Sequence, residues 1–309
     1  MKLLLLQSMR IKMSFVGLLF VSVLLLIPQL TLAAITSIIS DTETISVGDT
    51  AIVNVVLDTQ GSKPNTIEGD IEIMSGAKNI TISEFSLAGS ALKFWPKTPS
   101  LDSATKISFI GGTPGGLKAK EALVFKIVFT ANAEGPVVFS PMNLKLYDND
   151  GKATLLESSS KPLTVTINPK GADARNYWLD ILTADKQPPY DIQVSFGQNS
   201  SVYGGQKFMT ISATDDESGI NYYEVVEGDR PAVRSGNTYV LIDQREKTVL
   251  TVIAYDKAGN SSKILVTPTD TKPGSNWWGI IAIVVILFGG AYGLLWLKKK
   301  RHSSKKIGF

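Results

Sequence analysis

The sequence contains no cysteine, and its one histidine is His302, close to the C-terminus. The lack of cysteine excludes disulfides, thiolate metal sites and cysteine nucleophiles. Because His302 stands in a basic tail, a Ser-His-Asp triad or a histidine-based zinc site is excluded from the rest of the chain. No pair of carboxylates stands out as an alternative. We therefore expect no catalytic residue, no cofactor and no metal ligand.

The basic residues are concentrated at the two ends of the 309-residue chain, whose net charge is +3. Lys2, Arg10 and Lys12 precede the first apolar run, and six further Lys and Arg residues follow the last one. The part between them is acidic, with a net charge of about −6. Basic ends are typical of segments on the cytoplasmic side of a membrane. Nucleic-acid binding would need a basic patch on a folded domain, so we expect none.

The first 34 residues have the features of a secretory signal. A basic start is followed by an apolar stretch from Met13 to Ile27 and by Pro28, and Ala33 and Ala34 offer small residues for cleavage. An uncleaved signal anchor is the alternative. In both cases the middle of the chain lies outside the membrane.

Residues 277–297 predict one transmembrane helix. Gly279 to Leu297 carries no charge, and at 1.5 Å per residue this stretch spans about 28 Å, close to the thickness of the hydrocarbon core. Tryptophans stand at both ends, as in an aromatic belt, and a basic cluster follows. We expect a single-pass protein of the cell membrane, with most of the chain extracellular and the C-terminus cytoplasmic.

Between these segments the pattern is that of short strands and turns. From Thr66 to Ile73, isoleucines at 67, 71 and 73 alternate with Glu68, Asp70 and Glu72. This period of two predicts strands with one face on a core. Similar runs up to residue 169 favour one β-sandwich, and those from 192 to 268 favour a second, of about seven strands. Residues 172–186 suit a short helix or an ordered linker.

These features predict an all-β protein. The expected divisions are a signal peptide (1–34), a β-sandwich (35–169), a linker (170–190), a smaller β-sandwich (191–268), a stalk (269–276), a transmembrane helix (277–297) and a basic tail (298–309).

The first sandwich resembles a cohesin domain of the cellulosomal scaffoldin type. The segment Ile45 to Thr59, I-S-V-G-D-T-A-I-V-N-V-V-L-D-T, is similar to the opening of that domain. Segments 65–69, 107–112, 122–129 and 146–152 follow in the family's order. The resemblance covers about residues 36–168. It implies a nine-stranded jelly-roll β-sandwich, a fold that in this family binds dockerin modules in scaffolds for polysaccharide breakdown.

The second sandwich resembles bacterial immunoglobulin-like repeats, through residues 213–220 and 254–261. That family is mostly a spacer or adhesive module. We therefore expect a non-enzymatic surface protein that displays a cohesin-like module to a dockerin-like or other extracellular protein. A carbohydrate-binding adhesin, with a polysaccharide as partner, and a small carboxylate-based glycosidase are the alternatives.

The resemblance places partner contacts on an open sheet face of the cohesin-like domain. In the strand at 66–73 the outward side chains are Glu68, Asp70 and Glu72, about 7 Å apart along one face. Ser108 and Ile110 extend this patch if their strand belongs to the same sheet. We predict these five residues as the partner-binding site, with a solvated acidic strand as the alternative.

Two places in the sequence have features of a calcium site. Asp148 to Gly151 has one glycine and two aspartates of a calcium loop, but position one would be Leu146, so a plain turn is favoured. Asp215, Asp216, Glu217 and Asp256 form a second acidic set, for which turn capping is the alternative to calcium.

Two further segments have some features of ligand sites. Phe94-Trp95-Pro96 offers an aromatic face for a sugar, although a tryptophan packed under a loop is favoured. The run from Gly111 to Gly116 lacks the spacing of a phosphate loop, so phosphate binding is not expected.

Overall fold

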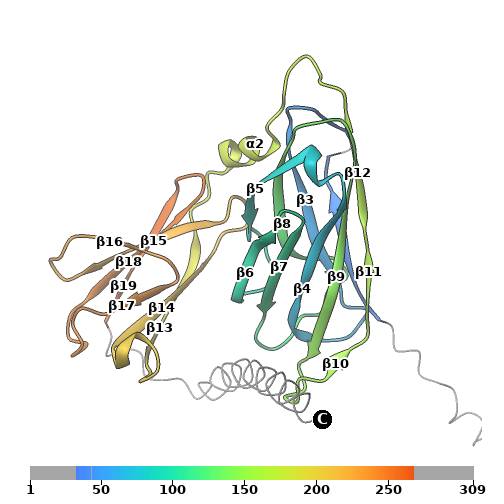
Figure 1. Cartoon of the computed structure of the whole chain (residues 1–309). Coiled ribbons are helices and arrows are strands. Elements are labelled where there is room, and N and C mark those ends of the chain that lie inside the picture. The colour runs from blue at the N-terminus through green and yellow to red at the C-terminus, as the bar shows by residue number, and fades with distance from the viewer. Residues whose placement is uncertain (1–32, 43, 268–309) are drawn as a thin grey trace, which may run out of the picture. The chain divides into compact units, whose positions relative to one another are not determined.

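A computed structural model describes residues 33–42 and 44–267. The chain divides into two units between Trp178 and Leu179, within the predicted linker, and strands dominate both (Figure 1). The expected β-rich architecture is confirmed. Helix α2 (Tyr177–Ala184) lies in the stretch predicted as a short helix.

The predicted transmembrane helix, stalk and tail, and all but the last two residues of the predicted signal, lie outside the described residues. Within residues 33–42 and 44–267, no helix is long and apolar enough to cross a membrane.

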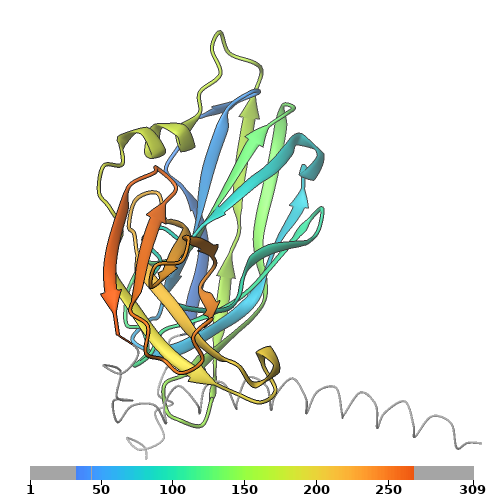
Figure 2. The same ribbon diagram turned by 90° about the vertical axis from the view of Figure 1, so that its left-hand side faces the viewer.

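The first unit is a sandwich of two sheets (Figures 1 and 2). One sheet has the strand order β11-β1-β3-β8-β5, and the other has β2-β12-β9-β4-β7-β6, with β10 paired to β9. The strands are β1 (Ala34–Ser40), β2 (Ile45–Ser46), β3 (Thr50–Asp58), β4 (Pro64–Ser75), β5 (Ile80–Ser86), β6 (Phe94–Ser103), β7 (Lys106–Gly112), β8 (Ala122–Ala131), β9 (Gly135–Asp148), β10 (Leu155–Leu156), β11 (Ser158–Lys161) and β12 (Leu163–Asn168). A 3₁₀ turn, η1 (Ala77–Asn79), precedes β5.

The predicted alternation places one side of each sheet in a common core. In β4, Ile67, Ile71 and Ile73 are buried, as expected from their period of two. Aromatic rings fill the space between the sheets: the centroids of Phe109 and Phe125 are 5.0 Å apart in an edge-on arrangement. Such pairs stabilise a core beyond the area that they bury.

The second unit has seven strands in two sheets, with orders β13-β14-β17 and β16-β15-β18-β19. They are β13 (Tyr190–Gln198), β14 (Lys207–Thr214), β15 (Ile220–Glu227), β16 (Val233–Ser235), β17 (Thr238–Val240), β18 (Leu250–Asp256) and β19 (Ser261–Val266), with the 3₁₀ turn η2 (Tyr203–Gly205) before β14. Met209, Val225 and Val252 are completely buried in its core.

The strand pairing defines two ends of this unit. Tyr190 pairs with Thr214, and Ile220 with Asp256, at the end where the chain begins β13. At the other end the pairs are Gln198 with Lys207, Glu227 with Leu250, and Leu250 with Val266. We call these the N-terminal and C-terminal ends of the second unit.

Candidate functional site

The five predicted contact residues lie on one face of the larger sheet of the first unit. Glu68, Asp70 and Glu72 are on β4, and they pair with Ile110, Ser108 and Lys106 of β7. Cross-strand partners share a face of a sheet. Ile67, Ile71 and Ile73 of β4 point into the core, so the carboxylates at the alternate positions point away from it. We call this surface, formed by β9, β4, β7 and β6, the open face.

Lysines on the neighbouring strands neutralise two of the three β4 carboxylates. Lys145 of β9 lies 2.7 Å from Glu68 Oε1, and Lys106 of β7 lies 2.9 Å from Asp70 Oδ2. The hydrogen bond to Asp70, reinforced by its charge, raises the pKa of Lys106, and Glu68 does the same for Lys145. The open face therefore carries alternating charges instead of a purely acidic stripe.

Asp70 is held from both sides, and its residue is only 8% exposed. Opposite Lys106, the amide of Asn143 donates to Asp70 Oδ2 over 2.8 Å. Asn143 adopts a left-handed conformation (φ 52°) at a bulge in β9, which asparagine tolerates better than most residues. A Cβ on Gly69, opposite this bulge, would lie 2.7 Å from Leu144 Cδ2 and 3.2 Å from the carbonyl oxygen of Met142, so a side chain here would displace Leu144. The bulge fixes the Asp70 carboxylate.

Ser108 forms part of a second charged group, on β6 and β7. Its hydroxyl donates to Asp102 Oδ2 over 2.7 Å, and Lys97 lies 3.0 Å from Asp102. The Ser108 hydrogen bond, and then Lys97, lower the pKa of Asp102. Ile110 is half-buried nearby on β7. Exposed Met74 lies on β4 and exposed Met142 on β9.

Trp95 packs inward, as favoured from the sequence. Its ring meets Phe125 edge-on, with 6.4 Å between centroids. A Cβ on Gly111 would lie 2.9 Å from the Trp95 ring, so this glycine makes room for the indole. The partly buried indole therefore packs against the core of the first unit.

The segment 148–151 forms a turn between β9 and β10, which confirms the favoured interpretation. Asp150 accepts the Lys152 N–H over 2.8 Å and the Thr154 hydroxyl. These two bonds lower the pKa of Asp150, led by that from Thr154. The carboxylate stabilises the turn.

A different acidic cluster forms at the N-terminal end of the second unit. Oxygens of Asp185, Asp215 and Asp256 lie within 4.8 Å of one another, and all three residues are buried. The sequence correctly put Asp215 and Asp256 in one set. Asp216 and Glu217 are exposed, and Asp216 accepts the Tyr190 hydroxyl. Asp185 was missed, because only the fold brings it from the end of α2 to this cluster.

Backbone N–H groups donate hydrogen bonds to all three carboxylates of this cluster. Ser218 N–H donates to Asp185, Gly219 N–H to Asp215 and Asn260 N–H to Asp256. Burial raises the pKa of Asp215 despite the Gly219 hydrogen bond, and the two neighbouring carboxylates raise it further. Carboxylate oxygens are ligands that Ca²⁺ prefers, and in this cluster they also accept these amide bonds.

We predict that Asp215→Asn stabilises the second unit at pH 7. Because the pKa of Asp215 is higher in the folded unit, its protonation stabilises the fold at acidic pH, and this stabilisation is lost as the pH rises through the folded pKa. Asparagine keeps an acceptor for Gly219 and removes the charge. The melting temperature of the second unit should rise by about 2–5 °C at pH 7 and by less at pH 4.

Calorimetry in the presence of a chelator measures this shift. Asp216→Asn, next to it but exposed, is the matched control and should leave the melting temperature nearly unchanged. A lower melting temperature for Asp215→Asn at pH 7 would show that its charge stabilises the unit.

No protein-family model and no curated protein matches the sequence. Among solved structures, part of the chain is similar to cohesin modules. One is the cohesin module of a family 33 glycoside hydrolase from Clostridium perfringens, with 13% identity, 45% of this chain and 98% of that chain covered, and a TM-score of 0.38.

Two other cohesins give similar values. A non-cellulosomal cohesin from Archaeoglobus fulgidus has 12% identity over 44% of this chain and 91% of its own, with a TM-score of 0.37. The seventh ScaB type I cohesin of Pseudobacteroides cellulosolvens has 14% identity over 45% and 94%, with a TM-score of 0.39. Likeness at this level does not assign the chain to a family.

Proposed function

We propose that the chain displays a cohesin-like module outside the membrane, and that the open face binds a dockerin-like or other extracellular protein. The observation that carries this proposal is the gathering of Glu68, Asp70, Glu72, Ser108 and Ile110 on two paired strands. Protein interfaces typically combine apolar contacts with a polar, solvent-accessible rim. Met74 and Met142 add adaptable apolar contacts.

The sequence segments that resemble a cohesin domain support the assignment of the first unit. Segment 45–59 covers β2 and β3, 107–112 lies on β7, and 122–129 lies on β8. They therefore correspond to strands of a single sandwich. The seven strands of the second unit, three in one sheet and four in the other, support an immunoglobulin-like spacer.

Membrane anchoring is the second part of the proposal. The apolar stretch 279–297 with its flanking tryptophans and basic cluster supports a single transmembrane helix with the C-terminus inside. The N-terminal apolar stretch supports export. Both units are then extracellular, and the chain acts by binding, without catalysis.

A protein partner is better supported than a glycan. Trp95 packs against the core, and the hydroxyl of Tyr147 on the open face is bonded to Glu68 at 3.2 Å. Glu68, Asp70 and Asp102 of this face are likewise bonded to lysines, which suits charge complementarity more than acid–base chemistry.

We predict that replacing Glu68, Asp70 and Glu72 together by serine slows association with the partner. The partner is first recovered with residues 33–267 from the organism's secreted proteins. Since the substitutions leave Lys106 and Lys145 unpaired, the association rate of a basic or hydroxyl-rich partner should fall about three- to tenfold at low salt, with a shallower salt dependence.

Surface plasmon resonance at several salt concentrations measures both quantities. The control replaces three exposed carboxylates outside the open face, Glu121, Glu134 and Glu157, by serine, which changes the net charge equally. Equal rates for the two triple variants would contradict binding at the open face.

A further inference from the structure

Exposed apolar side chains gather at the C-terminal end of the second unit. Eight large apolar residues of this unit are exposed among the described residues. Six of them lie at this end: Val202, Tyr203, Val233, Ile242, Val249 and Leu265. Leu265, next to the last residue of β19, is 76% exposed. Apolar side chains concentrated in this way mark a contact surface.

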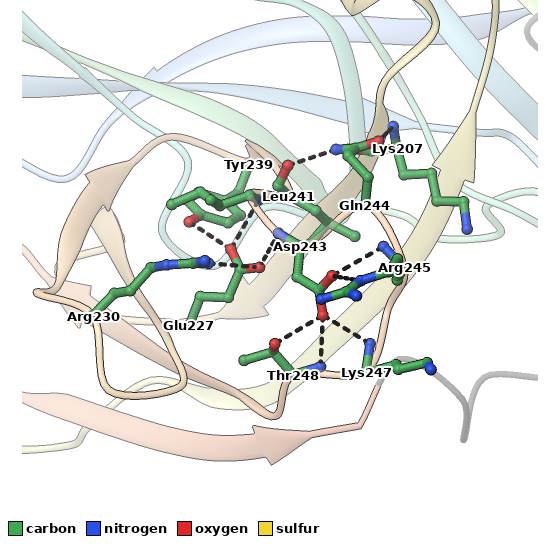
Figure 3. Close-up of polar contacts among 11 residues, drawn as sticks. Lys207, Glu227, Arg230, Tyr239, Leu241, Asp243, Gln244, Arg245, Lys247 and Thr248 are labelled. Carbon is green, nitrogen blue, oxygen red and sulfur yellow. Dashed lines mark hydrogen bonds and ion pairs between the residues drawn. The ribbon is translucent and has the colours of Figure 1, made fainter.

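These side chains belong to ordered segments. The Ile242 and Asp243 N–H groups donate to the buried carboxylate of Glu227, the first over 2.9 Å (Figure 3). Asp243 accepts the Thr248 hydroxyl and the amides of Arg245, Lys247 and Thr248. Two carboxylates thus hold the 241–249 loop in place, and they hold its apolar side chains toward solvent.

Most charges at this end are paired within the unit. Lys207 lies 3.0 Å from Glu246, Arg230 lies 3.3 Å from Glu227, and Arg245 lies 3.5 Å from Asp243. The segments 228–232 and 241–249, with Glu227 and Lys207, hold four cationic and four acidic side chains. A contact here therefore depends on apolar burial and not on net charge.

The chain leaves the unit at this same end. Val266 ends β19, and ten residues separate it from Trp277, at the start of the predicted transmembrane helix. Ten residues span at most about 35 Å. The proposed anchor therefore keeps a lipid surface within reach of the apolar side chains, while the N-terminal end lies at the opposite ends of the same strands.

We propose that the C-terminal end of the second unit rests on the lipid bilayer, with Ile242, Val249 and Leu265 in its headgroup region. This proposal rests on the membrane anchor proposed above. Apolar and aromatic side chains are favoured at that depth. Because the charges of this end balance, zwitterionic lipid suffices and salt does not weaken the contact.

The test uses the full chain in liposomes of zwitterionic lipid. The chain has no cysteine, so Leu265→Cys and Ile242→Cys each give one labelling site for a fluorophore. Ser261→Cys, exposed at the other end of β19, is the control. Lipids with a nitroxide on the headgroup should quench labels at 265 and 242 at least about threefold more than at 261, at low and high salt.

A second variant tests the apolar contact itself. In Tyr203→Cys, replacing Ile242, Val249 and Leu265 by serine should reduce quenching at 203. Tyr190→Ser, an exposed aromatic replaced at the N-terminal end, should not. All four replaced side chains are exposed, so these variants should keep the fold. If the protein floats with the liposomes but the labels at 265, 242 and 261 are quenched weakly and equally, the proposal is overturned and the anchor is not. Energy transfer between labelled copies, without quenching by lipid, would overturn the proposal in the same way. Failure to float would overturn the anchor, and with it this proposal.

Discussion

Replacing Glu227 by alanine is expected to destabilise the second unit by about 3–5 kcal/mol while the first unit stays folded. Glu227 is 2% exposed and accepts hydrogen bonds from the Tyr239 hydroxyl and the N–H groups of Ile242 and Asp243 (Figure 3). Alanine leaves these donors without their acceptor, at about 1–3 kcal/mol for each donor that stays buried. A unit of about 80 residues is stable by only roughly 4–12 kcal/mol.

Two spectroscopic signals distinguish the unfolding of the two units in a fragment of residues 33–267. Its two tryptophans, Trp95 and Trp178, both belong to the first unit, so their fluorescence reports only that unit. Circular dichroism reports both units. Glu224→Ala is the matched control, because Glu224 lies on the same strand and faces outward. A Glu227→Ala melting curve that coincides with that of the control would refute this role.

The hydrogen bond from the Tyr239 hydroxyl to Glu227 belongs to the same network and can be weakened without removing the Glu227 side chain. Burial, and then the bond to Glu227, raise the pKa of Tyr239 to about 12. Glu227→Gln keeps the shape but offers one acceptor oxygen instead of two. Its loss of stability should fall between those of the control and the alanine variant.

Gly76→Ala should destabilise the first unit by about 3 kcal/mol or more. Gly76 has a φ of 71°, and a Cβ there would lie 2.2 Å from the carbonyl oxygen of Pro136 and 3.0 Å from Val137 Cα. Because these are backbone atoms of β9, relief requires a shift of the strand that carries Lys145 and Asn143. Tryptophan fluorescence should therefore report unfolding at lower denaturant, with the second unit unaffected.

Gly115→Ala provides the comparison. Its φ of 81° is equally left-handed, but a Cβ would meet nothing within 4 Å. Only the backbone penalty remains, about 1 kcal/mol. If both alanine variants lost the same stability, the clash with Pro136 would not be the cause.

The sequence predicts strands well where one face is regular. Between Ile67 and Ile73 of β4 the inward positions hold isoleucines, except for Gly69, and the outward positions hold carboxylates, and the expected strand at 66–73 lies within β4. The longer β9 was not predicted, because Pro141 and the left-handed Asn143 interrupt its alternation at the bulge. Pro96 and Pro99 obscured β6, which is an edge strand where proline is tolerated.

The candidate site shows the same limit. Glu68, Asp70 and Glu72 were found from one strand, and Ser108 and Ile110 from a second strand. Their lysine partners come from β7 and β9, and strand pairing cannot be read from a period of two. Asp185 was not predicted beside Asp215 and Asp256 for a similar reason, since local sequence does not show which turns meet at one end of a sandwich.

The path of the chain through the second unit has a mechanical consequence. The chain comes in at the start of β13 and leaves after β19, at the opposite end. If the chain is anchored and binds a partner as proposed, a pull on that partner would load the strands of the second unit lengthwise. Since β13 and β19 belong to different sheets, the force must slide one sheet past the other and break many contacts together. The second unit then resists tension by shear between its two sheets, and its lifetime under load is set by its unfolding rate.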